Sequence, residues 1–197
     1  MDNHHLFELI NASPGMGHVH LWLTTALAAW LIYLVPPVML LGWVRGDHAA
    51  RRELLEILFA VLMALALAQA VAHVWPQPRP FVLHLGTQYL QHGGDPGLPS
   101  DHVTVFWSLA LAALFSRQFA AWGFPLLAVG LAVGWSRVYL GVHFPYDVVA
   151  ALPVALVGVA LARAMRRPLL PAIARILCSY DRLASLLRVR TRPTRES

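Results

Sequence analysis

Residues 54–75 read LLEILFAVLMALALAQAVAHVW, an apolar run that contains a single charged residue, Glu56. A helix needs about 20 apolar residues to cross the hydrocarbon layer of a membrane, so this run predicts a membrane-spanning helix. Further stretches that reach or approach this length are residues 20–44, 103–115, 122–140 and 148–165. We therefore predict an all-α integral membrane protein with a bundle of about five transmembrane helices, of which the third is the shortest.

The composition of the whole chain supports the same fold class. Of its 197 residues, 58% are hydrophobic and only 13% are charged, and the mean hydropathy is +0.58. A soluble globular domain normally carries about 25% charged residues. Since no internal repeat or shift in composition marks a boundary, we interpret residues 1–197 as one membrane domain. Its core covers residues 20–166 and follows a short N-terminal segment.

All 15 basic residues are arginines, and their positions predict how the chain is oriented in the membrane. Loops rich in arginine usually face the cytoplasm. Three groups follow the first, third and fifth predicted spans, namely Arg45, Arg51 and Arg52, then Arg117, and then Arg163, Arg166 and Arg167. With five crossings, this pattern places the amino terminus outside and the carboxyl terminus in the cytoplasm. It also accounts for the net charge of +5 without nucleic-acid binding.

The C-terminal segment 168–197 is predicted to be a basic tail on the cytoplasmic side. Within it, residues 169–187 mix Leu and Ile with Arg175, Asp181 and Arg182. Such a mixture is typical of an amphipathic helix that lies on the membrane surface. We therefore expect an interfacial helix after the last span.

Arg79 and Arg137 do not follow the orientation rule, because each lies at the outer end of a predicted span. An arginine near the hydrocarbon boundary is costly unless it meets water or an anion, and such residues are candidates for function. The alternative is an interfacial arginine whose guanidinium reaches lipid phosphate.

Three short polar segments share this outer face. They are Pro78-Arg79-Pro80, then Pro99-Ser100-Asp101-His102, and then Ser136-Arg137 followed by His143 and Asp147. The first segment ends the second span, the second begins the third span, and the last leads from the fourth span to the fifth. A helical bundle would therefore gather them around one outward-facing pocket.

These residue types suit phosphate binding and phosphoryl transfer. The guanidinium groups of Arg79 and Arg137 can each bind phosphate oxygens with two hydrogen bonds. Ser100 is predicted to cap the third helix, whose free amides and dipole favour an anion. His143 and Asp147 are four residues apart, so the carboxylate can orient the imidazole as a nucleophile. Taken separately, these features also fit an ordinary helix cap, a structural hydrogen bond or a pair of metal ligands.

In combination, the three segments resemble the three signatures of the type 2 phosphatidic acid phosphatase superfamily, in the family order and at the family spacing. The resemblance covers roughly residues 72–147. It implies that His143 attacks phosphorus to form a phosphohistidine, that Asp147 orients His143, and that His102 protonates the leaving group. It also implies a set of phosphate ligands, which are Arg79, Arg137, Ser100 and the backbone N–H of Asp101, with Pro80 in a positioning role. No metal or other cofactor is implied.

Two positions depart from the usual signatures. Ala72 stands where the family usually has a lysine, and Asp101 replaces a glycine, so its carboxylate must point away from the phosphate. Both departures resemble the bacterial undecaprenyl-diphosphatase branch of the bacitracin-resistance type. Arg79-Pro80-Phe81 and the segment FELINA at residues 7–12 are similar to that branch as well.

The resemblance to this branch implies a polyprenyl diphosphate substrate. Undecaprenyl diphosphate would be hydrolysed to undecaprenyl phosphate and phosphate at the outer face of the bacterial cytoplasmic membrane, which recycles the cell-wall carrier lipid. One alternative is a lipid phosphatase acting on phosphatidic acid or phosphatidylglycerol phosphate, and another is a transferase that moves the phosphate to lipid A. A non-catalytic lipid-binding or carrier protein is a third alternative, raised by Ala72.

Overall fold

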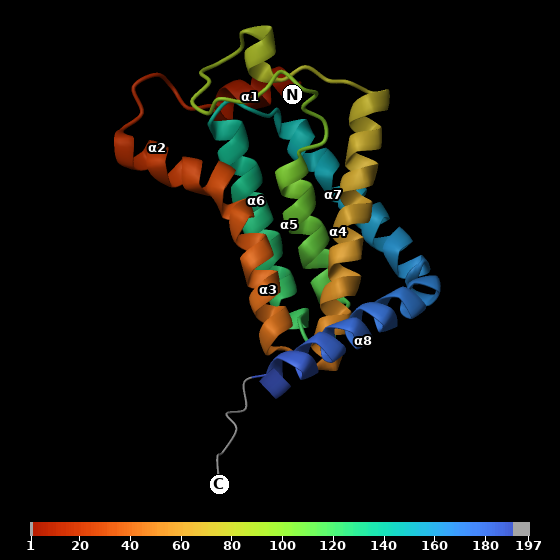
Figure 1. Cartoon of the computed structure of the whole chain (residues 1–197). Helices are drawn as coiled ribbons and strands as arrows, with labels where there is room; N and C mark the ends of the chain where they lie inside the picture. Colours follow the sequence, from red (N-terminus) through yellow and green to blue (C-terminus); the bar gives the residue numbers. More distant parts are fainter. Residues whose placement is uncertain (1, 191–197) are drawn as a thin grey trace.

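The computed structural model describes residues 2–190, and all of its elements are helical (Figure 1). Helix α5 (Asp101–Leu114) lies at the centre and packs against α4 (His48–Val74), α6 (Gly123–Tyr139) and α7 (Pro145–Ala164). Four segments are long and apolar enough to cross a membrane, namely His18–Arg45, His48–Val74, Ala120–Tyr139 and Pro145–Ala164. The predicted all-α membrane fold is confirmed.

Helix α5 corresponds to the third predicted span and is shorter than the others. Its 14 residues extend over about 21 Å, whereas the hydrocarbon layer is about 30 Å thick. Ten of these residues are buried among the three neighbouring helices, so lipid does not have to cover them. The helix begins deeper in the bundle than the outer end of α4 (Figure 1). The residues at the start of α5 are therefore recessed.

The first predicted span, 20–44, is present but is not one regular helix. It consists of α2 (His18–Thr25), a π-helical turn (Ala26–Trp30), a 3-10 turn (Leu31–Leu34) and α3 (Val35–Arg45). Pro36 and Pro37 have no N–H for the carbonyls of the preceding turn, which accounts for the change in winding there. This span lies on the flank of the bundle, and only 6% of its most apolar 18-residue stretch is buried inside the protein.

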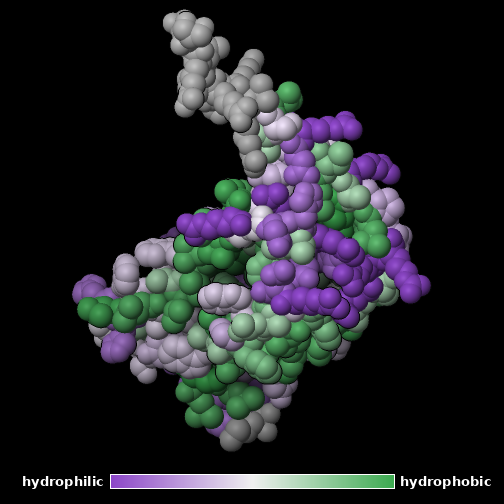
Figure 2. Space-filling model, turned by 90° about the horizontal axis from the view of Figure 1, so that it is seen from below, coloured by the Kyte–Doolittle hydropathy of each residue, from purple (hydrophilic) through white to green (hydrophobic). Residues whose placement is uncertain are grey.

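Helix α8 (Arg166–Arg190) lies across one end of the bundle, where the arginine-rich loops also lie (Figure 1). It is longer than the predicted 169–187 helix. His48 Nε2 is 2.9 Å from Asp181 Oδ2, and the guanidinium of Arg51 lies 4.5 Å from the ring of Tyr180. Hydrophilic side chains gather along α8 when the molecule is viewed from this end (Figure 2). Residues 191–197 of the predicted tail lie outside the described residues.

At the opposite end, α1 (Asn3–Ile10) and the loop from α4 to α5 cover the bundle (Figure 1). Phe7 is fully buried, with its ring 5.4 Å from that of Phe144. The side chain of Asn11 accepts a hydrogen bond from Thr87 N at 2.7 Å and donates to the carbonyl oxygens of Thr87 and Tyr139. These contacts tie the N-terminal segment and the outer loop to the end of α6.

Candidate active site

The structure brings together the predicted outer residues that come from three distant parts of the chain. Five of them are almost completely buried, with 4% or less of each exposed, namely Arg79, Ser100, Arg137, His143 and Asp147. Burial of charged groups is costly unless they are paired or meet a ligand, so such clusters favour a functional site.

His143 lies in the short loop between α6 and α7, where its ring is oriented by Asp147. Gly141 allows the loop to turn, because its φ of +81° is a conformation that other residues rarely adopt. Asp147 Oδ2 lies 3.2 Å from His143 Nδ1 and accepts the backbone N–H of Phe144 at 2.8 Å. An ionised carboxylate favours the tautomer with hydrogen on Nδ1, which leaves the lone pair on Nε2.

The surroundings of His143 favour its neutral form. Burial lowers the pKa of His143 well below its ordinary value of 6.5, and the positive charges of Arg137 and Arg79 lower it further. Only the neutral imidazole has a lone pair available for attack. The ring of His143 therefore keeps this lone pair at neutral pH.

Arg79 lies directly beside the nucleophilic nitrogen, and backbone carbonyls hold it there. Its Nη1 is 3.0 Å from His143 Nε2 and donates to Val142 O at 3.1 Å. Its Nε donates to Asp95 O at 2.9 Å, and its Nη2 donates to Pro96 O at 3.3 Å. The guanidinium is thus held next to Nε2, within reach of the oxygens of a phosphoryl group attached to that nitrogen.

Arg137 and Ser100 each have a buried polar atom that makes no hydrogen bond within the described residues, Nε of Arg137 and Oγ of Ser100. Arg137 Nη1 donates to Ala28 O at 2.8 Å, in the π-helical turn of the first span. A buried polar atom without a partner costs about 1–3 kcal/mol, so both atoms suit contact with a bound anion.

Ser100 occupies the predicted N-cap position of α5, but its hydroxyl does not cap the helix. Its backbone N–H donates to Asp147 O at 3.0 Å, which joins the start of α5 to the start of α7. Asp101 follows, and both oxygens of its carboxylate accept from Gln69 Nε2 at 3.0 Å. The carboxylate is therefore engaged with α4. His102 lies in the first turn of α5, within electrostatic reach of the site arginines.

The outer loop adds two residues that we did not predict as part of the site. Asp95 Oδ2 accepts from Arg79 Nη2 at 2.7 Å, and the ring of His92 lies 6.5 Å from that of His143. Partial burial would raise the pKa of Asp95, but the hydrogen bond and charge of Arg79 outweigh it and hold this pKa below its ordinary value. Burial and the charge of Arg79 lower the pKa of His92.

Gly97 allows this loop to pass close to the site. A Cβ atom at this position would lie 3.0 Å from Asp147 Oδ2 and 3.2 Å from Arg79 Cγ. No signal in the sequence identified Asp95, His92 or Gly97 as site residues, because their roles depend on how the loop closes over Arg79.

Comparison with known proteins identifies the family of the chain. Residues 53–170 match the model of the PAP2 superfamily. YbjG of Escherichia coli (strain K12) is 33% identical over 185 residues, which cover 94% of this chain and 93% of that protein. Undecaprenyl-diphosphatase BcrC of Bacillus subtilis (strain 168) is 29% identical, over 77% of this chain and 79% of its own length.

The fold is shared with a solved structure. The crystal structure of Aquifex aeolicus LpxE superposes with a TM-score of 0.65 and covers 81% of this chain and 93% of that chain, at 20% sequence identity. The match to the family model covers more than half of the chain, and the similarity to YbjG extends over nearly all of it. The chain therefore belongs to the PAP2 superfamily.

Proposed function

We propose that this chain is an undecaprenyl-diphosphatase. It hydrolyses undecaprenyl diphosphate to undecaprenyl phosphate and inorganic phosphate, at the membrane face opposite α8. The observation that carries this proposal is the position of His143, whose Nδ1 is 3.2 Å from Asp147 Oδ2 and whose Nε2 is 3.0 Å from Arg79 Nη1. A carboxylate on one side and a phosphate-binding guanidinium on the other suit an imidazole that accepts a phosphoryl group.

The reaction takes two steps. His143 Nε2 attacks the terminal phosphorus, the bond to the bridging oxygen breaks, and His102 gives a proton to the leaving undecaprenyl phosphate. A water molecule then attacks the phosphohistidine, His102 takes its proton, and phosphate leaves as the bond to Nε2 breaks. Asp147 stabilises the ring while it carries positive charge. After both steps, His143 is free again and His102 has regained its proton.

The remaining buried groups stabilise the transferred phosphoryl group. Arg79 and Arg137 bind its equatorial oxygens, and Ser100 donates its hydroxyl. Such preorganised donors supply much of the rate enhancement in phosphoryl transfer, since the developing charge meets them without rearrangement. Two guanidinium groups therefore remain as cationic ligands although Ala72 replaces the usual lysine.

An apolar groove beside the site favours a lipid with a long hydrocarbon tail. It has a volume of about 440 Å³ and lies between α1, the end of α4 and the start of α7, against Asp147. Its apolar walls include Trp75, Leu83, Phe144, Val149 and Pro153. A prenyl chain can lie in this groove while its diphosphate reaches His143. The name of the relative BcrC points to the same substrate.

The arginine-rich loops and α8 lie at the other end of the bundle, which we propose faces the cytoplasm of a bacterial cell. The site then opens to the outside. An enzyme in this position would recycle the cell-wall carrier lipid at the outer face.

The substrate is tested by comparing undecaprenyl diphosphate with phosphatidic acid at equal surface density in the same detergent micelles. We expect kcat/KM to be at least about tenfold higher for the prenyl diphosphate, since its tail fills the apolar groove. Faster hydrolysis of phosphatidic acid would instead indicate a broader lipid phosphatase. Transfer of labelled phosphate to lipid A would indicate a phosphotransferase. Saturable lipid binding with no phosphate released would indicate a carrier.

Asp95 provides a second test, because its carboxylate competes with phosphate for Arg79. Three backbone carbonyls hold the guanidinium independently of that carboxylate. We therefore expect Asp95→Asn to tighten inhibition by inorganic phosphate about threefold, as loss of one partly exposed charge allows. The inhibition constant is measured from initial rates. Asp95→Glu keeps the charge and serves as control, and an unchanged constant in Asp95→Asn would show that the carboxylate does not compete.

A further inference from the structure

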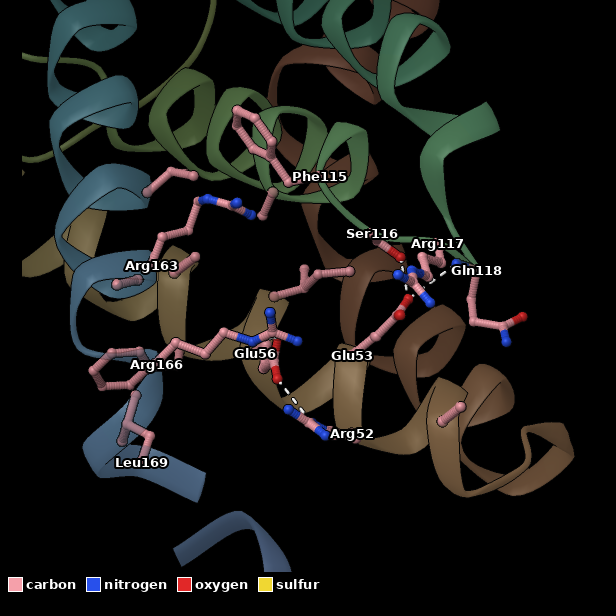
Figure 3. Close-up of a pocket in the computed structure, with 17 residues that line it drawn as sticks. Arg52, Glu53, Glu56, Phe115, Ser116, Arg117, Gln118, Arg163, Arg166 and Leu169 are labelled. Carbon is pink, nitrogen blue, oxygen red and sulfur yellow. Dashed lines mark hydrogen bonds and ion pairs between the residues drawn. The ribbon is translucent and has the colours of Figure 1, made fainter. Parts of the chain in front are cut away.

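A second cavity lies at the α8 end of the bundle, remote from His143 (Figure 3). Its volume is about 460 Å³, and it is bounded by α4, α5, α7 and the start of α8. Charged side chains line part of it, namely Arg52, Glu53, Glu56, Arg117, Arg163 and Arg166. The apolar part is formed by Ile57, Phe59, Ala60, Ala112, Phe115 and Val159. The cavity is therefore polar on one side and apolar on the other.

Both carboxylates of the cavity are already occupied by protein groups. Glu56 binds two arginines, with its Oε1 3.0 Å from Arg52 Nε and its Oε2 2.9 Å from Arg166 Nε. Glu53 accepts hydrogen bonds from the hydroxyl of Ser116 and from the backbone N–H of Gln118 (Figure 3). The charge of Glu56 is thus shared by two arginines, whereas Glu53 is held by neutral donors.

The cavity therefore has an excess of positive charge. Four arginines and two glutamates line it. Within residues 2–190, neither Arg117 nor Arg163 forms an ion pair with a carboxylate. Arg163 instead lies over the ring of Phe115, with its guanidinium carbon 4.1 Å from the ring centroid (Figure 3). Phe115 is itself 61% exposed, so its ring offers apolar surface next to this guanidinium.

We propose that this cavity binds an anionic phospholipid from the membrane leaflet at the α8 end. Arginine is well suited to bind phosphate, and basic residues next to transmembrane helices attract anionic lipids. The phosphate lies against Arg117 and Arg163, and the first carbons of an acyl chain contact Phe115 and the apolar side. A soluble anion would leave that apolar side uncovered, so a lipid matches the cavity better.

A lipid bound in this way would add a contact between helices that already pack against one another. Arg163 belongs to α7, and Arg117 follows α5. Glu56 of α4 is the group that connects Arg52 with Arg166 at the start of α8. One phosphate shared by Arg117 and Arg163 would add a link between α5 and α7 at this end.

The proposal is tested by native mass spectrometry of the full chain in detergent, with phosphatidylglycerol titrated against phosphatidylcholine of the same acyl chains. We expect the wild type to retain one phosphatidylglycerol more strongly than phosphatidylcholine. The double variant Arg117→Gln/Arg163→Gln should bind it about tenfold more weakly, since each basic residue near an anionic lipid contributes severalfold to its affinity. The double variant Arg175→Gln/Arg182→Gln removes the same charge from α8 outside the cavity and should bind as the wild type does.

Two results would overturn the proposal. Equal weakening in both double variants would show general attraction between α8 and anionic lipid rather than a site. Displacement of phosphatidylglycerol by inorganic phosphate at the same concentration would show that a soluble anion is the ligand. Because lipid retention is the measurement, the outcome does not depend on whether the catalytic proposal holds.

Discussion

Replacing His143 by alanine should abolish phosphate release from undecaprenyl diphosphate. The imidazole is the group that forms the bond to phosphorus in the proposed mechanism, so its loss removes the covalent route. We expect a decrease in kcat of about ten-thousandfold or more, as is typical for loss of a nucleophile. A colorimetric assay measures the phosphate that purified protein in detergent releases from undecaprenyl diphosphate.

The control for this variant is His18→Ala, which removes an exposed imidazole at the start of α2. Both variants should elute as folded protein from a size-exclusion column. Undiminished phosphate release by His143→Ala would remove the covalent mechanism from consideration.

Asp147→Asn should lower kcat by about a thousandfold or more, with little change in KM. The amide is almost the same shape, and its oxygen can take the place of Oδ2, which accepts the N–H of Phe144 and faces His143 Nδ1. The amide carries no negative charge, so it stabilises the positive charge on the phosphorylated ring far less than the carboxylate does.

Asp181→Asn is the matched control, because this carboxylate lies at the α8 end and contacts His48. Its kcat should stay within about twofold of the wild type, as expected for an exposed surface pair. If kcat of Asp147→Asn is as high as that of the control, the negative charge of Asp147 is not needed for catalysis.

Much of the architecture could be predicted because its signals are local. An apolar run long enough to cross a membrane specifies a helix without reference to the rest of the chain, as residues 54–75 show. The polar residues at the outer ends of the helices could likewise be grouped once the spans were counted. Arg79 and Arg137 were recognisable because an arginine near the hydrocarbon boundary is costly unless it contacts water or an anion.

Other features depend on tertiary contacts and left no local signal. Pro36 and Pro37 indicate an irregularity, but the bond from Arg137 to Ala28 O requires α6 to lie beside that turn. Asp95 lies in a loop whose composition is typical of any turn, and its contact with Arg79 appears only when the loop closes. The cavity at Arg163 combines four helices, so no single segment could reveal it.

The short central helix has a consequence for how a membrane lipid meets its enzyme. Since α5 starts below the outer end of α4, the diphosphate of the proposed substrate can descend to His143 while its prenyl tail stays in the bilayer (Figure 1). Pulling a tail into water would cost about 0.8 kcal/mol for each CH2 group exposed. A reaction site at the depth of the lipid headgroups avoids that cost, because the substrate does not have to leave the bilayer to react.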